Sequence, residues 1–428
     1  MNSSIKYIIL TSLYTKRRGN SLSTKKHLLV ISQYFYPEEF RINDICKNWI
    51  ERGYKVTVVT GIPNYPQGEY YEGYSRTENR REKWEGIEIV RLPIRPRYKG
   101  SINLIRNYFS FVFEGYKWVR QTNVNVDLVY TYEVSPMTQA LVGVKYARKF
   151  KVPHYLYVTD LWPENIEIIT GIKNKVLMYP ISLMVDYIYK HSKRIFTSSK
   201  SFIKSINDRG VPLDKLEFWP QYAEEYYKPI SNIDPEIRDC FKQDTFNIVF
   251  AGNIGYAQGL NILIPVAQAL NKRKRKATFV LIGDGRYKSE LYKQVQEQGL
   301  SSSFQFIERQ PSARIPAYLA MADALLISLA KSEVFSITIP AKTQSCLACA
   351  KPILLSADGE VQQIITESGA GFVSNAEDFE GLVSNIEKMM ALPSEERLEL
   401  GMLASEYSKK FFDREKLLDR IDEVFYAE

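Results

Sequence analysis

The chain has 428 residues, a formal net charge of +8, 45% hydrophobic residues and 25% charged residues. This length favours two domains of about 200 residues each, and the composition is typical of a soluble globular protein. The basic charge suits an anionic substrate or an anionic membrane surface. Nucleic-acid binding is disfavoured, because the sequence has no zinc-finger spacing, no aromatic RNA-binding pattern and no long basic tail.

Residues 1–25 are predicted to form a peripheral N-terminal extension. Their apolar stretch, Ile5 to Tyr14, contains Lys6 and is far shorter than the ~20 apolar residues of a membrane-spanning helix. No cleavage-site pattern marks it as a signal peptide. The four cysteines form no disulfide framework in a chain of this size, so we expect a cytoplasmic protein.

A first parallel sheet is predicted from His27 onwards. His27–Ser32 and Lys55–Thr60 are predicted as buried strands, joined by a loop and a helix. This unit indicates a doubly wound α/β domain, whose ligands bind beyond the carboxyl ends of the strands. The loops Tyr34–Arg41 and Gly61–Tyr74 are therefore expected at the functional rim. The second loop suits either acceptor recognition or an ordinary ordered surface loop.

Two segments combine apolar and basic residues at helical spacing. In Lys99–Arg120 the basic residues lie away from a single apolar face, and Val176–Tyr189 raises the same question. Such a helix either lies in the headgroup region of an anionic membrane or packs on the sheet. The apolar face of the first segment consists of Ile105, Tyr108, Phe109, Val112, Phe113, Tyr116 and Val119.

Carboxylates follow another predicted strand, His154–Val158. Asp160 and Glu164 come directly after it, with Trp162 between them. A carboxylate at this edge either accepts a proton from an acceptor hydroxyl or caps the next helix. None of the three histidines has metal-ligand spacing, so no metal site is predicted.

The strand pattern restarts after a polar stretch that ends near Asp244. Asn247–Ala251 is predicted as a strand that runs into the glycine loop Gly252–Gly259 and then into a helix from Leu260. Glycines let backbone N–H groups approach an anion, and a helix start favours negative charge. Further glycine turns follow later strands at the same sheet edge. A second doubly wound domain with a phosphate site is therefore predicted.

The order of these motifs resembles the GT-B glycosyltransferases of family 4, from His27 to the C-terminus, and most closely the fucosamine-transferase-like group. The matching residues are Gln33–Glu38 with Arg41, Thr60–Pro66, Asp160–Glu164, Gly252–Gly255 with Gln258 and Gly259, Pro340–Thr343 and Gly359–Val361.

The resemblance implies two Rossmann-like, doubly wound parallel-sheet domains that face each other across a cleft. Residues 26–225 would bind the acceptor, residues 226–410 would bind a sugar nucleotide, and a helix in 411–428 would cross back to the N-terminal domain. Such enzymes retain anomeric configuration and need neither a metal nor a cofactor. The expected acceptor-side residues are Tyr36, Arg41, Asn64, Tyr65 and Trp162. The expected donor-binding residues are Gly252, Asn253, Gly255, Gln258, Gly283, Gly285, Arg309, Ser345, Gly359, Glu360 and Val361.

The chain departs from the family pattern at its charged positions. Two glutamates common in the family correspond here to Ile337 and Ser345, and the glycine loop lacks the usual Arg and Lys. Lys342 is the candidate cation for the diphosphate, unless it is an ordinary exposed lysine. Glu360 either takes hydroxyls of the ribose or donor sugar, or caps its helix. Asp160, Glu164 and Lys342 are the candidate catalytic residues.

The resemblance leads to one leading hypothesis. A sugar moves from a nucleoside diphosphate, expected to be UDP-linked and to carry an N-acetylated deoxy-sugar such as N-acetylfucosamine, to a glycan acceptor. The acceptor is expected to be polyprenyl-diphosphate-linked and to lie at the inner membrane leaflet, within capsule or O-antigen synthesis. Two alternatives are a non-catalytic nucleotide-binding scaffold and a nucleotide-sugar epimerase of the same shape.

Overall fold

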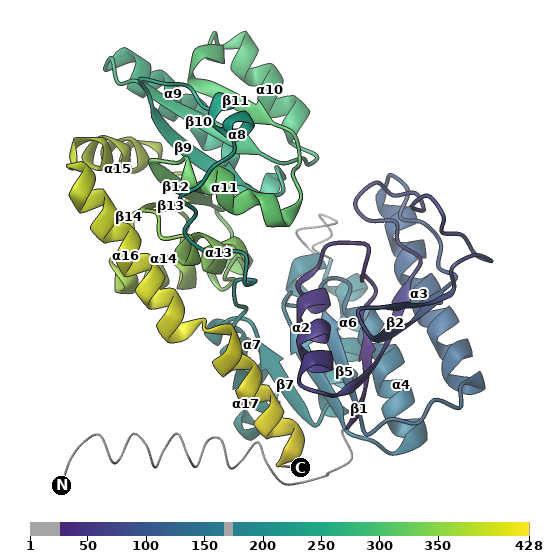
Figure 1. The fold of residues 1–428 in the computed structure, drawn as a ribbon. Helices are drawn as coiled ribbons and strands as arrows, with labels where there is room; N and C mark the ends of the chain where they lie inside the picture. Colours follow the sequence, from purple (N-terminus) through teal and green to yellow (C-terminus); the bar gives the residue numbers. More distant parts are fainter. Residues whose placement is uncertain (1–25, 167–173, 428) are drawn as a thin grey trace, which may run out of the picture. The chain divides into compact units, whose positions relative to one another are not determined.

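The computed structural model describes residues 26–166 and 174–427, and it contains two β-sheets with their flanking helices (Figure 1). The predicted extension 1–25 lies outside the described residues. Within the described ranges, none of the helices combines the length and the apolarity needed to cross a membrane.

The first sheet has eight strands in the order β3-β4-β2-β1-β5-β6-β7-β8. The chain-order alternation of strands and helices produces parallel neighbours such as β1 with β2 and β6 with β7, whereas β3 and β4 form an antiparallel hairpin. Glu85 and Gly86 both have positive φ in its two-residue turn, as a tight hairpin requires. The strands are β1 His27–Ile31, β2 Lys55–Gly61, β3 Arg81–Trp84, β4 Ile87–Leu92, β5 Leu128–Glu133, β6 His154–Val158, β7 Arg194–Thr197 and β8 Leu216–Phe218.

The second sheet has six strands in the order β11-β10-β9-β12-β13-β14, and every pair is parallel. Successive residues of β9, such as Ile248 and Val249, enter opposite apolar clusters, because side chains alternate between the faces of a sheet. The strands are β9 Phe246–Ala251, β10 Ala277–Ile282, β11 Phe304–Ile307, β12 Ala324–Ser328, β13 Ile353–Ser356 and β14 Gly371–Ser374.

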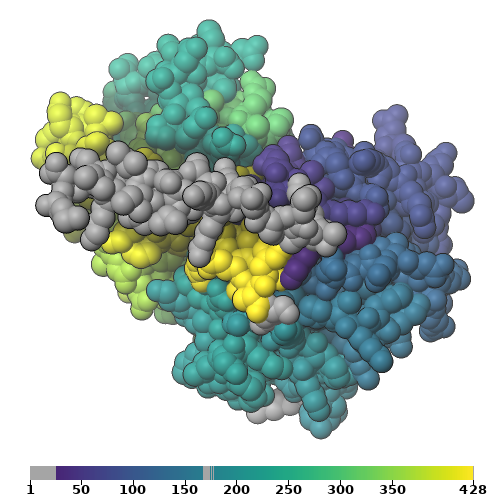
Figure 2. Space-filling view, turned by 60° about the horizontal axis from the view of Figure 1, so that its bottom comes forward, coloured from purple at the N-terminus to yellow at the C-terminus, as the bar shows by residue number. Residues whose placement is uncertain are grey.

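Helices cover both faces of the second sheet, which makes it doubly wound as predicted. One apolar cluster joins it to α9, α10 and α15, and the other joins it to α11, α13, α14 and α16 (Figure 1). Much of α16 is exposed, and its yellow surface is visible in Figure 2. The helices are α8 Pro235–Asp239, α9 Leu263–Lys272, α10 Lys288–Glu297, α11 Ile315–Ala320, α12 Glu333–Ser336, α13 Lys342–Ala348, α14 Glu360–Ser368, α15 Phe379–Ala391, α16 Ser394–Phe411 and α17 Arg414–Tyr426.

Contacts divide the chain into two compact units. Among the described residues, one comprises those up to Thr131 together with Thr138–His154, and the other comprises Tyr132–Met137 together with those from Tyr155 onwards. Helix α17 belongs to the second unit. The Trp219 indole N–H donates to the Leu417 carbonyl there at 2.7 Å. The domain boundaries expected from the family resemblance stay a prediction.

The helices of the N-terminal half are α2 Arg41–Glu51, α3 Ser101–Gln121, α4 Ala140–Phe150, α6 Lys175–Lys190 and α7 Lys200–Asn207. Helix α3 has two apolar faces, where we expected one. Phe111 and Val119 pack with α4 and the strands in an apolar cluster, and Tyr108 is only 7% exposed. Phe109 and Phe113 are 60% and 70% exposed. The single face expected from the sequence was wrong, because it mixed residues of the buried and the exposed faces.

Phe111→Ala and Phe109→Ala form a matched pair on opposite faces of α3. We expect Phe111→Ala to lower the free energy of unfolding by about 3–5 kcal/mol, because it opens a cavity in the core. The exposed Phe109→Ala variant should change it by less than about 0.5 kcal/mol. Urea unfolding followed by circular dichroism measures both, and equal losses would contradict this assignment of faces.

Candidate active site

The carboxyl edge of the second sheet brings two glycine loops into direct backbone contact. A Cβ on Gly283 would overlap the Gly252 carbonyl oxygen, and a Cβ on Gly285 would overlap that of Ile254. The Gly252 amide donates to the Ile282 carbonyl at 2.9 Å, and the Ile254 amide donates to the Asp284 carbonyl at 2.8 Å. All three glycines have positive φ, which side chains disfavour. Gly283 and Gly285 therefore allow these loops to pack against each other.

Two further loops meet the same edge. Gly259 has a φ of 60°, and a Cβ there would lie 2.9 Å from the Ala330 amide nitrogen, after β12. Gly359 precedes α14, and a Cβ there would overlap the Ser336 carbonyl. Together with the contact between Gly283 and Gly252, these contacts join the segments that follow β9, β10, β12 and β13.

Only part of the glycine loop is available to an anion. The amides of Gly252, Ile254 and Gly283 already donate to backbone carbonyls. Within the described ranges, the amides of Asn253 and Gly255 donate to no acceptor. These two N–H groups can therefore bind an anion without breaking a bond inside the protein.

Lys342 places an ammonium group on this loop. Its Nζ donates to the Gln258 side-chain oxygen at 2.7 Å and lies 3.6 Å from the centroid of the Phe250 ring. It also lies 3.2 Å from where a Cβ on Gly252 would stand. In the described part of the chain no carboxylate pairs with it. Lys342 is thus a cation that lacks a counter-ion at a loop with free amides.

Burial lowers the pKa of Lys342 from 10.5 to about 7, because the charged form is desolvated. A bound anion would favour the ammonium form and raise this pKa. The arrangement therefore couples anion binding to proton uptake near neutral pH. This chemistry is that of a site for a diphosphate or a similar anion.

The remaining expected donor-side residues lie in varied surroundings. Ser345 is 6% exposed and Val361 is fully buried in the core, whereas Arg309 is exposed after β11. Glu360 is 8% exposed. Its carboxylate accepts hydrogen bonds from the Ser199 hydroxyl at 2.6 Å and from the Lys200 and Ser201 amides at 2.8 Å each. Glu360 thus caps α7 rather than its own helix, and these contacts occupy both of its oxygens.

Asp160 is held by a backbone amide on a neighbouring segment. Its Oδ2 accepts from the Ser135 N–H at 2.6 Å, and the Trp162 indole donates to the Ser135 hydroxyl at 3.0 Å. Trp162 is only 5% exposed, so it organises this turn. The Oε2 atom of Glu164 is buried and has no hydrogen-bond partner among the described residues.

Sequence reasoning missed Glu133, which lies beneath Asp160. It is fully buried, and its carbonyl accepts from the Thr159 amide at 2.9 Å. Burial raises the pKa of Glu133 well above its usual value, and the nearby Asp160 charge adds to this effect. In the sequence, Glu133 is recognisable as the carboxylate that ends the apolar strand β5.

The expected acceptor-side residues mostly hold their loops in place. Asn64 is fully buried, and its side chain bonds to the Ile62 carbonyl and the Arg97 amide. Glu38 accepts from the Asn64 and Tyr65 amides at 2.8 and 2.7 Å. Burial raises the pKa of Glu38 to about 7.

The two other expected acceptor-side residues lie on the loop that follows β1. The half-buried Tyr36 ring stacks on Trp84 with a centroid distance of 4.4 Å, and Arg41 begins α2. Tyr36 and Tyr65 are both half-buried, and the ring of each contacts another aromatic ring.

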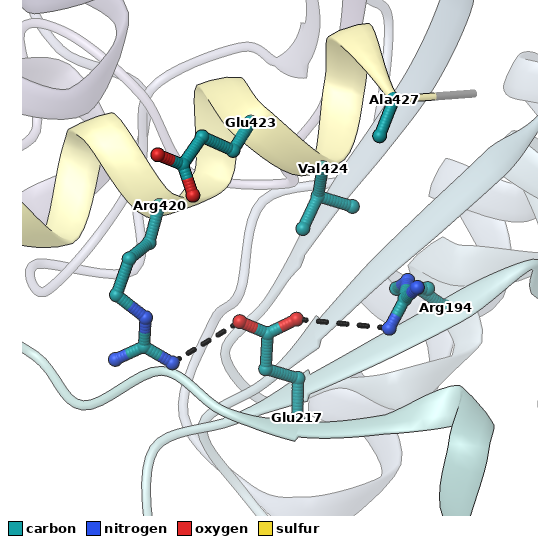
Figure 3. A pocket seen from close by; sticks show the side chains of 6 residues that line it. All are labelled: Arg194, Glu217, Arg420, Glu423, Val424 and Ala427. Atoms are coloured by element: carbon teal, nitrogen blue, oxygen red, sulfur yellow. Dashed lines mark hydrogen bonds and ion pairs between the residues drawn. The ribbon is translucent and has the colours of Figure 1, made fainter.

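A hollow of about 220 Å³ lies beside α17 (Figure 3). Arg420 lies 3.1 Å from one oxygen of Glu217, and Arg194 lies 3.8 Å from the other. The two arginines that line it both pair with Glu217, so it is a weak candidate for binding an anion. Among the described residues, no group of three or more His, Cys, Asp or Glu side chains is placed to hold a metal ion.

The fold places this chain among GT-B proteins. Sucrose-phosphate synthase of Thermosynechococcus elongatus has a TM-score of 0.74 at 14% identity, over 94% of this chain and 99% of that one. Anabaena HepE in complex with UDP-glucose has a TM-score of 0.68 at 14% identity, over 94% of this chain and 100% of that one. These likenesses show the two-domain fold.

The sequence comparisons then give the family. A model of glycosyltransferase family 4 matches residues 39–221, and one of the glycosyl transferases group 1 matches residues 236–407. WcaI of Escherichia coli (strain K12), named as a colanic acid biosynthesis glycosyl transferase, is 25% identical over 415 residues, 91% of this chain and 97% of that protein. The chain thus contains a glycosyltransferase family 4 domain followed by a glycosyl transferases group 1 domain, which makes it a glycosyltransferase.

Gly283→Ala tests the backbone contact at the site. We expect it to lower the free energy of unfolding by about 3 kcal/mol or more, because the new Cβ forces the two glycine loops apart. Gly299→Ala is the control, since Gly299 also has positive φ but no neighbour within 4 Å, and it should cost only about 1 kcal/mol. Urea unfolding measures both variants. Similar losses of unfolding free energy in the two variants would mean that the positive φ alone, and not the contact between the loops, requires glycine at position 283.

Proposed function

We propose that the chain transfers a sugar from a nucleoside diphosphate sugar to a glycan acceptor with retention of configuration. The observation that carries the proposal is the Lys342 ammonium, which has no carboxylate partner in the described residues and lies on a loop with two free amides. Departure of a nucleoside diphosphate builds negative charge, and a fixed cation with backbone donors stabilises it. HepE, of the same fold, was solved with UDP-glucose, which supports a UDP-linked donor.

The finer assignments extend this proposal. The likeness to WcaI supports a role in bacterial surface polysaccharide synthesis, in which the donor is a UDP-linked N-acetylated deoxy-sugar such as N-acetylfucosamine. The resemblance to the fucosamine-transferase-like group favours the same donor. Its acceptor is a polyprenyl-diphosphate-linked glycan, and no bound metal is needed because Lys342 supplies positive charge.

The proton of the acceptor hydroxyl passes to the departing phosphate in this proposal. Asp160 then positions the acceptor, because its orientation is fixed by the Ser135 amide at 2.6 Å. Burial raises the pKa of Glu133, which favours its neutral form and so reduces its repulsion of the Asp160 carboxylate. Glu360 serves as a structural cap in this reaction, since both of its oxygens already accept hydrogen bonds.

Calorimetric titration with UDP, GDP and ADP, with and without EDTA, tests the donor site. We expect one nucleotide to bind, with an affinity that EDTA leaves unchanged. At pH 8 binding should take up protons, and affinity should fall as the pH rises above about 7, because the free lysine loses its charge there.

Lys342→Met should weaken nucleotide binding about tenfold or more and abolish the proton uptake. Lys388→Met, which removes an exposed lysine from α15, is the control and should leave both unchanged. Binding of none of the three nucleotides would instead favour a scaffold protein. Normal binding by Lys342→Met would remove this residue from the site.

We propose further that α3 binds the inner surface of the membrane. Ile102, Phe109 and Phe113 form an exposed apolar stripe on it, 67%, 60% and 70% exposed. Exposed Arg106 and Lys117 flank this stripe, which complements an anionic leaflet. A polyprenyl-linked acceptor would be reached from such a surface.

A double variant, Phe109→Ser with Phe113→Ser, should bind vesicles of phosphatidylglycerol and phosphatidylethanolamine at least about tenfold more weakly, because each ring contributes about 1.5 kcal/mol or more when buried. Vesicle sedimentation measures the partition coefficient. The control Phe379→Ser removes an exposed ring from α15 and should partition like the parent chain. Equal partitioning of the double variant and its parent would rule out this face of α3.

A further inference from the structure

The start of helix α7 contacts two segments of the second sheet at one buried hydroxyl. Ser199, the N-cap of α7, is fully buried, and its Oγ lies 2.5 Å from the Ile337 carbonyl oxygen and 2.6 Å from Oε2 of Glu360. Ile337 directly follows α12 and lies five residues before Lys342, whereas Glu360 begins α14. Ser199 therefore joins the segment that leads to Lys342 to the start of α14.

The Ser199 hydroxyl has two acceptors but a single proton. It can donate to the Ile337 carbonyl or to the Glu360 carboxylate, but not to both at once. Because both oxygens lie within hydrogen-bonding distance, rotation of the hydroxyl alone transfers the bond from one segment to the other. This contact consequently has two hydrogen-bonded states.

The charge of Glu360 is met by the start of α7 and by no cation. The Lys200 amide donates to its Oε1 and the Ser201 amide donates to its Oε2, both at 2.8 Å. These N–H groups belong to the first turn of α7, where the helix dipole favours negative charge. In the described ranges no Lys or Arg side chain pairs with Glu360. The contact of Glu360 with Ser199, Lys200 and Ser201, here called the Glu360–α7 contact, is thus what stabilises this carboxylate.

The position of Glu360 makes its charge relevant to an anion at the glycine loop. Gly359, which precedes it, lies against the Ser336 carbonyl after β12. The same connection after β12 reaches the glycine loop, because the Ala330 amide donates to the Ala257 carbonyl at 3.0 Å. A carboxylate released from α7 would add negative charge to this set of joined segments and oppose the binding of a diphosphate.

We propose that Ser199 is a positioning residue for the donor site, which acts by holding the Glu360 carboxylate on α7 and away from the diphosphate. A bound anion repels Glu360 towards α7 and favours donation by Ser199 to Glu360 over donation to Ile337. Since coupling is reciprocal, an intact Glu360–α7 contact strengthens anion binding. The inference rests on the proposed function, and it assigns Ser199 an effect on the donor site without contact to the ligand.

Calorimetric titration of Ser199→Ala with UDP, GDP and ADP tests this role. The nucleotide that the parent chain binds should bind about fivefold more weakly or worse, because the variant loses one hydrogen bond to the carboxylate and frees its charge. The double variant Ser199→Ala/Glu360→Gln should recover at least the parent affinity, since the opposing charge is gone. A purely structural role for Ser199 predicts that the second substitution brings no recovery.

Asp378→Ala is the matched control, because Asp378 caps α15 by accepting from the Gly381 amide at 2.9 Å. Loss of either cap should lower the Tm by about 2–4 °C, but only Ser199→Ala should weaken nucleotide binding. Hydrogen exchange on the full parent chain gives an independent measurement. The bound nucleotide should slow exchange of the Lys200 and Ser201 amides, because it strengthens the Glu360–α7 contact.

Three results would overturn the proposal: parent-like nucleotide affinity in Ser199→Ala, no recovery in the double variant, or an equal loss of affinity in Asp378→Ala. Each of them leaves nucleotide binding by the parent chain intact, and with it the proposed function. Failure of the parent chain to bind any of the three nucleotides would instead refute the proposed function, and the role of Ser199 together with it.

Discussion

The contact on which the candidate active site depends is backbone against backbone. The loops after β9 and β10 meet so closely that no side chain fits at Gly283, where the Gly252 carbonyl lies. Because Gly252 has no side chain, the Lys342 ammonium can lie over Phe250 and reach Gln258. The free amides of Asn253 and Gly255 and this one cation are the outcome of that packing.

The charged groups at each candidate binding surface determine which kind of ligand that surface favours. The glycine loop carries an ammonium group whose charge no described carboxylate neutralises, which favours an anion. A hollow lined by the loops that follow β1 and β2 carries Glu69 and Glu72 and no described Lys or Arg. Glu38 and Glu133, in contrast, are buried, and their raised pKa values favour the neutral acid.

Part of the site was accessible to sequence reasoning. The glycine loop was found because a glycine turn after an apolar run is a local pattern. Lys342, Asn64 and Glu360 were expected from the family resemblance, and the contacts of Asn64 and Glu360 differ from the roles expected of them. Asn64 bonds to a residue 33 positions away, and Glu360 bonds to one 161 positions away. No periodicity within a segment encodes such partners.

The sequence by itself determined the two doubly wound α/β sheets, because unbroken apolar runs bounded by turns record strands that are buried on both faces. It also determined the glycine loops, since only glycine adopts their backbone angles without strain. Tertiary structure alone decided which apolar face of α3 is covered, which loop amides stay free, and that Glu133 is buried beneath Asp160. The reason is physical: the environment of a single polar or aromatic group is set by segments distant in the chain, whereas strand and turn formation is set by neighbours.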